Sequence, residues 1–446
     1  MKLQKPMRWK EGMFLKPQHF QQYDLYVESR EIGRFHAVES FGWGLLHLEL
    51  DESALDNYVF SISALRAVLS NGTLVDFPGT ANVASREFGE LMKEVGQGLD
   101  VSVGVKAQDD RGPWTAGAAS GAGDTRYLPA EEEVYDLDAG RDPAPLEKLA
   151  YNLRIFMGNE PTDGYETLQL ARLVLTGDTV RPVRPDARFS PPALVLAASP
   201  VLHGAARAVV EALTGTLRDL GQRRGVEHPD PLILYYGLSG SLPVLKDMVQ
   251  EGQVHTRKVY HELARLAGAL FYRDPQGRSA EEVPAYDHRN PGPVFERLRE
   301  LIIQLSEIAR REPFMRCPME RDKDQFHVML PDKAKQPGTR LYLEVLADDS
   351  SPKLRMLMLA SKISNPGRIQ HLRDNALPGV PTEPQPEAPA QLGPGQRGSF
   401  FRLHVDHTEW GTHVAGAGEL TLFMLGAPAD VKISLVLLFA DSPEAS

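Results

Sequence analysis

The chain has a single cysteine, Cys317, among its 446 residues. One thiol cannot form an internal disulfide and leaves no second thiolate for a cysteine-based zinc site. Long apolar runs are also missing, since the longest, such as 433–440, fall far short of the ~20 residues that cross a bilayer. No apolar segment of a secretory signal follows the basic N-terminus. These features predict a cytoplasmic protein that reaches a membrane through partners and does not insert into it directly.

Basic residues are scarce relative to acidic ones, with 49 Lys and Arg against 60 Asp and Glu and a net charge of -11. Non-specific nucleic-acid binding needs clustered Lys and Arg, so we expect no nucleic-acid partner. The sequence has no Gly-Lys pair, which excludes a Walker phosphate loop. His261-Glu262 is followed by Arg265 in place of a second metal-binding histidine, so it is no zinc-protease motif either.

The length and the hydrophobic content of 42% are sufficient for roughly three compact domains. Between residues 41 and 175 apolar and polar side chains alternate, as in Leu46, Leu48 and Leu50, a pattern typical of half-buried strands. Asn71-Gly72 indicates a tight hairpin. This part predicts a β-sandwich or barrel. We expect a loop at 109–124 and a solvated acidic turn at 131–133.

A proline-rich stretch, 181–192, then predicts a domain boundary, because proline removes backbone donors. Ser199-Pro200 is a favourable helix start. Four helices with apolar stripes are expected, from Pro200 to Gly221, from Asp230 toward Glu251, around 259–270 and from Pro293 onward. Such stripes predict a helical bundle. The first and last stripes have near-heptad spacing, so they could pack inside the bundle or against copies of the chain.

Alternation returns after Arg316 and predicts a third, mixed domain. Asn365-Pro366 predicts the start of a short helix. The stretch 376–398 is rich in proline and glycine and is expected to be an exposed excursion. The predicted fold class is therefore α+β multidomain: an N-terminal β-sandwich shell, a central helical-bundle neck and a C-terminal mixed α/β head. The predicted ranges are 1–20 for an N-terminal docking arm, 21–178, 193–312 and 316–446.

Candidate catalytic and metal-binding groups are weak. His404, His407 and His413 would converge on a metal only after a bend in the chain. Asp348 and Asp349 are neighbours and do not face each other across a substrate, as glycoside hydrolysis requires. We therefore expect neither an enzyme nor a cofactor or metal, although a carbohydrate-active enzyme and a phage-tail-like trimeric carbohydrate- or peptide-binding module are kept as alternatives.

The most informative segment is near the start, where large apolar side chains are interleaved with charges and amides over residues 9–20. A flexible Gly12 and a rigid Pro17 argue against a long regular element there. One interpretation is an arm packed on its own domain. The order W-x-E-G-M-F-L-x-P-Q-H-F-Q-Q, however, closely resembles the N-terminal signature of the TssK (ImpJ/VasE) family of type VI secretion baseplate subunits.

The resemblance implies a structural adaptor and homotrimer whose shell is similar to the shoulder of phage receptor-binding proteins. It implies that the shell binds the wedge subunits TssF and TssG, and that the head binds the cytoplasmic parts of the membrane-complex proteins TssL and TssM. The chain would thus be cytoplasmic and associated with the inner membrane through the secretion complex. The predicted partner-binding residues, chosen as apolar anchors, hydrogen-bonding groups or backbone pivots, are Trp9, Glu11, Gly12, Phe14, Leu15, Pro17, Gln18, His19, Phe20, Phe400 and Trp410.

Overall fold

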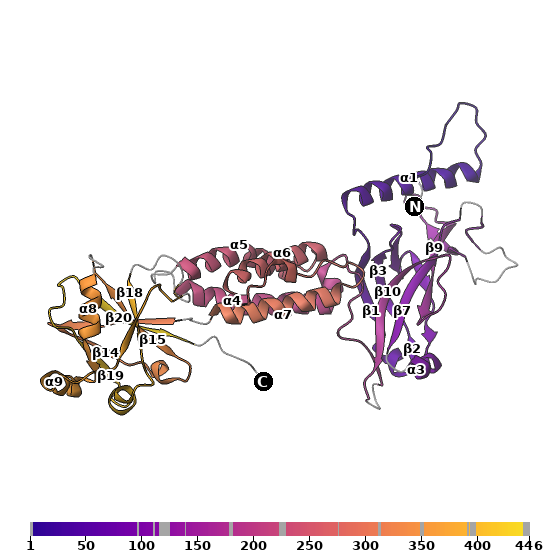
Figure 1. Cartoon of the computed structure of the whole chain (residues 1–446). Coiled ribbons are helices and arrows are strands. Elements are labelled where there is room, and N and C mark those ends of the chain that lie inside the picture. Colours follow the sequence, from indigo (N-terminus) through magenta and orange to yellow (C-terminus); the bar gives the residue numbers. More distant parts are fainter. Residues whose placement is uncertain are drawn as a thin grey trace. The chain divides into compact units, whose positions relative to one another are not determined.

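The computed structural model of the chain divides into two compact units, Met1–Arg310 and Arg311–Ser446 (Figure 1). It describes residues 3–95, 98–109, 112–115, 125–138, 140–177, 182–222, 229–274, 276–310, 314–347, 352–389, 392 and 398–439. Most of the expected loop at 109–124 and the pair Asp348 and Asp349 lie outside the described residues. The four predicted domain ranges stay predictions.

The first unit begins with helix α1 (Pro17–Val38), which is followed by a set of strands (Figure 1). The strands are β1 (Gly44–Leu50), β2 (Val59–Phe60), β3 (Ile62–Val68), β4 (Leu74–Phe77), β5 (Ala81–Val83), β6 (Arg86–Glu87), β7 (Leu99–Lys106), β8 (Tyr127–Val134), β9 (Ala144–Met157), β10 (Tyr165–Leu175) and β11 (Val183–Pro185). Two short helices, α2 (Glu52–Asp56) and α3 (Gly89–Val95), lie between them.

These strands form a sheet of order β1-β3-β4, a larger sheet of order β11-β10-β7-β9-β5 to which β8 adds by pairing with β9, and the small pair β2-β6. Side chains of the two larger sheets, such as Leu65 and Val103, belong to one core. The alternation predicted here is confirmed, since Val101, Val103 and Val105 of β7 are fully buried. The hairpin is confirmed as well, because β3 and β4 pair across Gly72, which has a φ of 92°.

The helical part of the first unit consists of four helices: α4 (Pro200–Gln222), α5 (Pro229–Glu251), α6 (Thr256–Leu270) and α7 (Pro291–Arg310). Helices α4, α5 and α7 begin within about two residues of their predicted starts, and α6 begins three residues before its predicted stretch. The hydroxyl of Ser199 accepts a hydrogen bond from the N–H of Leu202 at 3.3 Å, which confirms the predicted N-cap of α4. Single turns of 3-10 helix occur at Leu196–Ala198, Phe271–Arg273 and Ala280–Glu282.

The stripes of α4 and α7 are buried inside the bundle, where Leu213 and Leu298 are fully covered. The expectation that these stripes could face copies of the chain is corrected, because they are already covered by the other helices of the bundle. The exposed apolar side chains lie instead on α5, where Leu232, Tyr236 and Val244 follow one side of the helix. Periodicity identified the stripes but not the helices that cover them.

The second unit contains two sheets, of order β12-β20-β15-β18-β17 and β13-β14-β19-β16. Its helices are α8 (Pro352–Ala360) and α9 (Pro366–Asp374), with a 3-10 turn at Asp332–Lys335 and a π-helical turn at Trp410–Val414. The strands are β12 (Phe314–Pro318), β13 (Glu320–Asp322), β14 (Gln325–Met329), β15 (Arg340–Leu346), β16 (Lys362–Ser364), β17 (Thr382–Gln385), β18 (Ser399–Leu403), β19 (Glu419–Phe423) and β20 (Lys432–Leu438).

In the part of the stretch 376–398 that the structure describes, the chain is not the exposed excursion that its composition predicts. Strand β17 within it pairs with β18, and Val380 and Leu392 are buried. Leu392 packs with Tyr342 and Phe400 on the second face of the sheet. A few apolar side chains at the right places are therefore sufficient to dock a segment that is otherwise rich in proline and glycine. Both faces of β15 are buried as a result.

Candidate protein-docking surface

The segment before α1 makes a turn that brings apolar side chains to the surface. Gly12 has a φ of 76°, a conformation in which a side chain would be strained, and the N–H of Met13 donates to the carbonyl of Lys10 at 3.3 Å. Glu11 and Gly12 are exposed at this turn. The neighbouring Phe14 is 82% exposed. The turn thus holds Phe14 out of any core of this unit.

Helix α1 begins at Pro17, because proline is well suited to the first helical position. The N–H of Lys16 donates to Nδ1 of His19 at 2.9 Å, so that ring keeps its proton on Nε2 and helps to fix the start of the helix. The expectation of no long regular element around residues 9–20 is corrected. The helix includes Gln18 and Phe20 and continues to Val38, since no further proline or glycine breaks it near its start.

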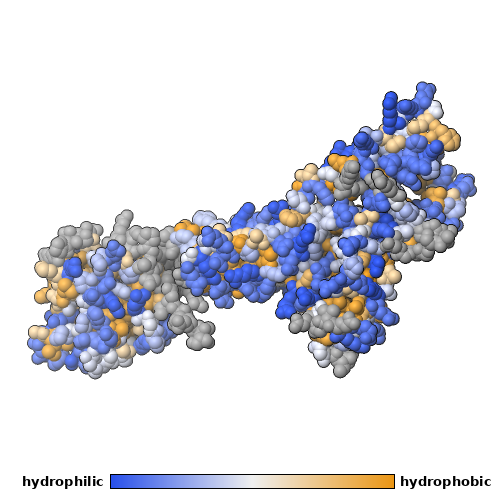
Figure 2. Space-filling view, turned by 45° about the vertical axis from the view of Figure 1, so that its right-hand side comes forward, coloured by the Kyte–Doolittle hydropathy of each residue, from blue (hydrophilic) through white to orange (hydrophobic). Residues whose placement is uncertain are grey.

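Aromatic rings gather where this segment meets α1. Trp9 lies 6.3 Å from both the His19 ring and the Tyr23 ring, measured between centroids. Phe20 and Leu15 are each about half exposed, as is Trp9. Orange, hydrophobic surface also gathers at the upper right of Figure 2, over α1 and the segment before it. Exposed apolar clusters of this kind mark interaction sites in soluble proteins.

The opposite side of α1 attaches the surface to the sheets. Leu25 and Ser29 are buried, and the hydroxyl of Ser29 accepts a hydrogen bond from the N–H of Gln4 at 3.1 Å. Ile32 packs against Gly72 at the hairpin so closely that a Cβ on Gly72 would clash with it. The arm therefore packs on its own unit and also exposes an apolar face, so the two interpretations of the sequence are compatible.

Two charged residues between α1 and the sheets, Arg126 and Glu28, were not predicted from the sequence as part of this site. Arg126 is buried, and Nη1 donates to the carbonyl of Lys106 at 2.7 Å while Nη2 donates to the hydroxyl of Thr73 at 3.2 Å. Glu28 of α1 lies near it, and burial raises the pKa of this carboxyl despite the attraction of Arg126. No local pattern marks either residue, because their roles depend on contacts between distant segments.

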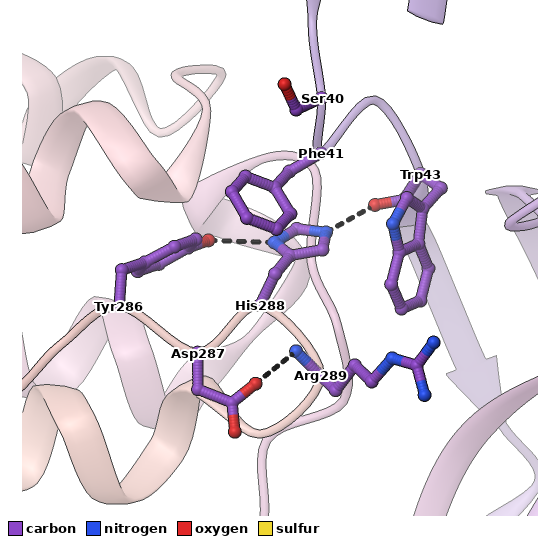
Figure 3. Close-up of a pocket in the computed structure, with 7 residues that line it drawn as sticks. All are labelled: Ser40, Phe41, Trp43, Tyr286, Asp287, His288 and Arg289. Carbon is purple, nitrogen blue, oxygen red and sulfur yellow. Dashed lines mark hydrogen bonds between the residues drawn. The ribbon is translucent and has the colours of Figure 1, made fainter.

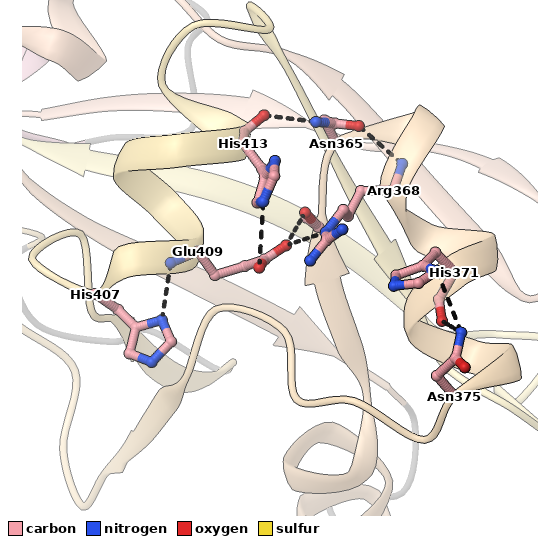
Figure 4. A network of polar contacts seen from close by, with 8 residues as sticks. Asn365, Arg368, His371, Asn375, His407, Glu409 and His413 are labelled. Atoms are coloured by element: carbon pink, nitrogen blue, oxygen red, sulfur yellow. Dashed lines mark hydrogen bonds and ion pairs between the residues drawn. The ribbon is translucent and has the colours of Figure 1, made fainter.

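The two predicted contacts of the second unit, Phe400 and Trp410, are both buried in its cores. They are core residues in this structure, so their assignment as exposed partner contacts is corrected. Trp410 lies in the π-helical turn beside a polar network (Figure 4). There Glu409 accepts hydrogen bonds from Ser364 at 2.7 Å and Arg368 at 3.3 Å. An alternating sequence pattern does not show which face of a strand other elements bury, so it could not show that an aromatic residue there lies in a core.

The same network includes two of the three histidines that had been considered as metal ligands, His407 and His413, whereas His404 lies near Glu383 and Asp406. Nδ1 of His407 accepts the N–H of Glu409 at 3.2 Å, and His413 lies 4.0 Å from Glu409 (Figure 4). Asn365 donates to the carbonyl of His413 at 2.6 Å. Within the described part of the chain, no group of His, Cys, Asp and Glu is arranged to hold a metal ion. Nor do the described residues include a helix that could span a membrane.

The fold and this surface together define a multi-part α/β protein with an exposed aromatic N-terminal face. A family model described as bacterial type VI secretion, VC_A0110, EvfL, ImpJ, VasE matches residues 19–438, so the chain belongs to this family. The resemblance that the N-terminal motif suggested is thereby confirmed. The matched range begins at His19, and the residues before it in the motif lie outside that range.

Among curated proteins, the type VI secretion system baseplate component TssK1 of Pseudomonas aeruginosa PAO1 is 28% identical over 440 residues, which cover 92% of this chain and 94% of that protein. The crystal structure of a TssK covers 98% of this chain and 100% of its own, with a TM-score of 0.64 and 22% identity. A chain of the TssK-TssF-TssG baseplate subcomplex covers 69% of this chain and 100% of its own length, with a TM-score of 0.62 and 26% identity. The mixed α/β class is thus shared with these structures.

Proposed function

We propose that this chain is a baseplate component of a bacterial type VI secretion system and acts as a structural adaptor rather than as an enzyme. The observation that carries the proposal is the family match over residues 19–438, together with similarity to a baseplate component over 92% of the chain. The adaptor works by binding neighbours at two surfaces, one in each unit. It acts in the cytoplasm and is associated with the inner membrane through its partners.

The first surface is the segment from Trp9 to Phe20, which binds subunits of the TssF and TssG type. A similar chain occurs in the TssK-TssF-TssG baseplate subcomplex, which supports this choice of partners. Phe14, with 82% of its surface exposed, and Trp9 are the apolar anchors, because large aromatic side chains dominate interface energetics. Glu11 and Gln18 are exposed beside them and provide hydrogen-bonding groups.

The second surface belongs to the C-terminal unit and binds the cytoplasmic parts of proteins of the TssL and TssM type. Because Phe400 and Trp410 are buried, we assign this contact to α8. Met356 and Leu359, one helical turn apart, are 67% and 52% exposed there. An exposed Met and Leu pair on a short helix is a suitable apolar contact for a partner protein.

The adaptor is a homotrimer in this proposal, and the outer side of α5 supports self-association. Leu232, Tyr236 and Val244 lie at helical spacing on that side, and Tyr236 is 68% exposed. A helix with apolar residues on its outward side as well as its inward side is expected to be covered by another surface. Orange surface over the helical part in Figure 2 is consistent with this assignment.

A pull-down with two crossed variants tests the adaptor. Phe14→Ala is expected to weaken binding of the TssF and TssG subunits by ~2 kcal/mol or more, about 30-fold in Kd, and to leave TssL and TssM binding unchanged. Changing both Met356 and Leu359 to serine is expected to do the reverse. Each variant is the control for the other, since both remove exposed apolar area.

Light scattering on each preparation checks that the particle has about three times the 49.4 kDa mass of one chain. Unchanged retention of the wedge subunits by Phe14→Ala contradicts the first surface, and unchanged binding of the membrane proteins by the serine variant contradicts the second. A monomer that binds neither set of partners contradicts the proposal as a whole.

A further inference from the structure

Two histidines of the helical part hold the segment that links α1 to β1. His255 precedes α6, and its Nε2 donates to the carbonyl of Phe41 at 3.0 Å. His288 precedes α7, and its Nε2 donates to the carbonyl of Trp43 at 2.7 Å (Figure 3). We call residues 39–43 with these two histidines the joint. The joint attaches the C-terminal end of α1 to the helical bundle within the first unit.

The hydrogen bonds fix the protonation of His255. A backbone carbonyl can only accept, so Nε2 carries a proton. Nδ1 accepts the N–H of Arg257 at 3.0 Å and therefore carries none.

His288 differs because its second nitrogen faces a hydroxyl. Nδ1 lies 2.8 Å from the hydroxyl of Tyr286, which lies 2.9 Å from the hydroxyl of Thr256. Thr256 in turn donates to the carbonyl of Ala193 at 2.7 Å. Three contacts thus follow Nδ1 in a chain, but the two hydroxyls supply only two protons. A neutral ring that carries its proton on Nε2 accepts the proton of Tyr286 at Nδ1, and the contact between the two hydroxyls then has no proton of its own.

The surroundings of the ring oppose a second proton on it. His288 is buried between the rings of Phe41 and Trp43, with centroids at 5.1 and 4.9 Å, and stacks on His255 at 5.7 Å. Burial and the neighbouring His255 lower the pKa of His288, although the carbonyl of Trp43 and the carboxylates of Glu39 and Asp287 act in the opposite direction.

The remaining groups near the ring do not change this balance. The guanidinium of Arg257 lies over the Phe41 ring at 5.0 Å, and Arg289 lines a pocket of about 310 Å³ beside His288. Burial raises the pKa of Tyr286 to about 12, so its hydroxyl keeps its proton at any physiological pH.

We propose that His288 makes the joint proton-sensitive: the neutral ring holds residues 39–43 against the bundle, and acidification favours an open joint in which the ring is solvated. A solvated histidine binds a proton near pH 6.5, whereas the closed joint binds it only at lower pH. The open state therefore gains protons first as the pH falls below ~6.5, and closure is fully favoured only above that value. This regulation concerns the chain itself and does not depend on the identity of its partners.

Hydrogen exchange of the full chain at pH 7.5 and pH 5.5, corrected for intrinsic exchange rates, tests the proposal. In the wild-type protein, the protection of residues 39–45 is expected to fall at pH 5.5 by up to about tenfold, because this pH lies about one unit below the pKa of a solvated histidine. His288→Gln keeps a donor for a carbonyl but does not titrate, so its protection is expected to be independent of pH. His261→Gln, an exposed histidine of α6, is the matched control and is expected to behave as wild type.

The same pH-dependent loss in His288→Gln, or no loss in the wild type, overturns the proposal. Titration of the wild-type chain with 13C-labelled histidines provides a test that does not require the glutamine variant to fold. The signal of His288 is expected to titrate below pH 6.5 and to move in Tyr286→Phe, which removes the hydroxyl beside Nδ1. A pKa of 6.5 or higher for that signal contradicts the proposal.

Discussion

Replacing Arg126 by methionine tests how much the buried guanidinium stabilises the first unit. The guanidinium is 4% exposed and donates to a carbonyl of Lys106 and to the hydroxyl of Thr73. It also lies 5.5 and 5.4 Å from the ring centres of Tyr127 and Tyr151. The described hydrogen bonds of this cation thus go to neutral groups, and the rings provide further electrostatic attraction.

The cost of the substitution can be estimated from these contacts. A hydrogen bond from a charged donor contributes ~1.5 to 3 kcal/mol, and each ring contact ~0.5 to 1 kcal/mol. These contributions sum to at least ~4 kcal/mol, but methionine keeps part of the apolar stem and removes the desolvation cost of a buried cation. The net loss is therefore about 3 kcal/mol, which corresponds to roughly a 100-fold fall in protection against hydrogen exchange. The affected peptides are expected to be those of β8, β9 and α1, which surround the side chain.

Arg154→Met is the matched control, because Arg154 of β9 also lies over aromatic rings but is exposed. Its expected cost is below ~1 kcal/mol. Equal effects of the two substitutions, or no change in protection around Arg126, refute the argument that the buried hydrogen bonds and ring contacts stabilise this region.

Two further substitutions address α9 and α1. Asn365→Ala is expected to destabilise the second unit by ~1 to 2 kcal/mol, because Asn365 caps α9 through the N–H of Arg368 at 2.9 Å and also donates to the carbonyl of His413. Thermal unfolding measures the loss, with the exposed Gln370→Ala as the control. Equal unfolding midpoints for the two variants contradict this prediction. Glu28→Gln is expected to increase the protection of α1 at pH 7.5 by less than about tenfold, because it removes a partly buried carboxylate, and a decrease in protection would contradict that account.

The parts of the fold that the sequence predicted well have local causes. Alternation placed Val101 and Val103 in a buried strand, and the side chains of Ser199 and Asn365 cap the helices that follow them. Each of these signals depends on residues within a few positions of one another. Such patterns can be recognised in the sequence without any knowledge of the tertiary structure.

The parts that the sequence did not predict depend on what covers a side chain. Phe400 and Leu392 pack together on the second face of a sheet, yet the intervening stretch is dominated by proline and glycine. His255 and His288 meet although 33 positions separate their numbers in the chain, and each lies just before a different helix. For the candidate site, the motif predicted Phe14 and Trp9 as apolar anchors, and both are exposed, but the extent of α1 and the role of Arg126 follow from packing alone.

The two titrating groups that hold α1 respond to pH in opposite directions. The closed state raises the pKa of Glu28 above its ordinary value of 4.5, so the folded contact binds a proton more readily than the open one and strengthens as the pH falls toward that value. The closed joint lowers the pKa of His288, so its contact weakens over the pH range below 6.5. Acidification to pH 5.5 therefore favours release of residues 39–43 while the middle of α1 stays on the sheet. General acid destabilisation would lower the protection of both regions together, and this difference separates a local joint from unfolding of the whole unit.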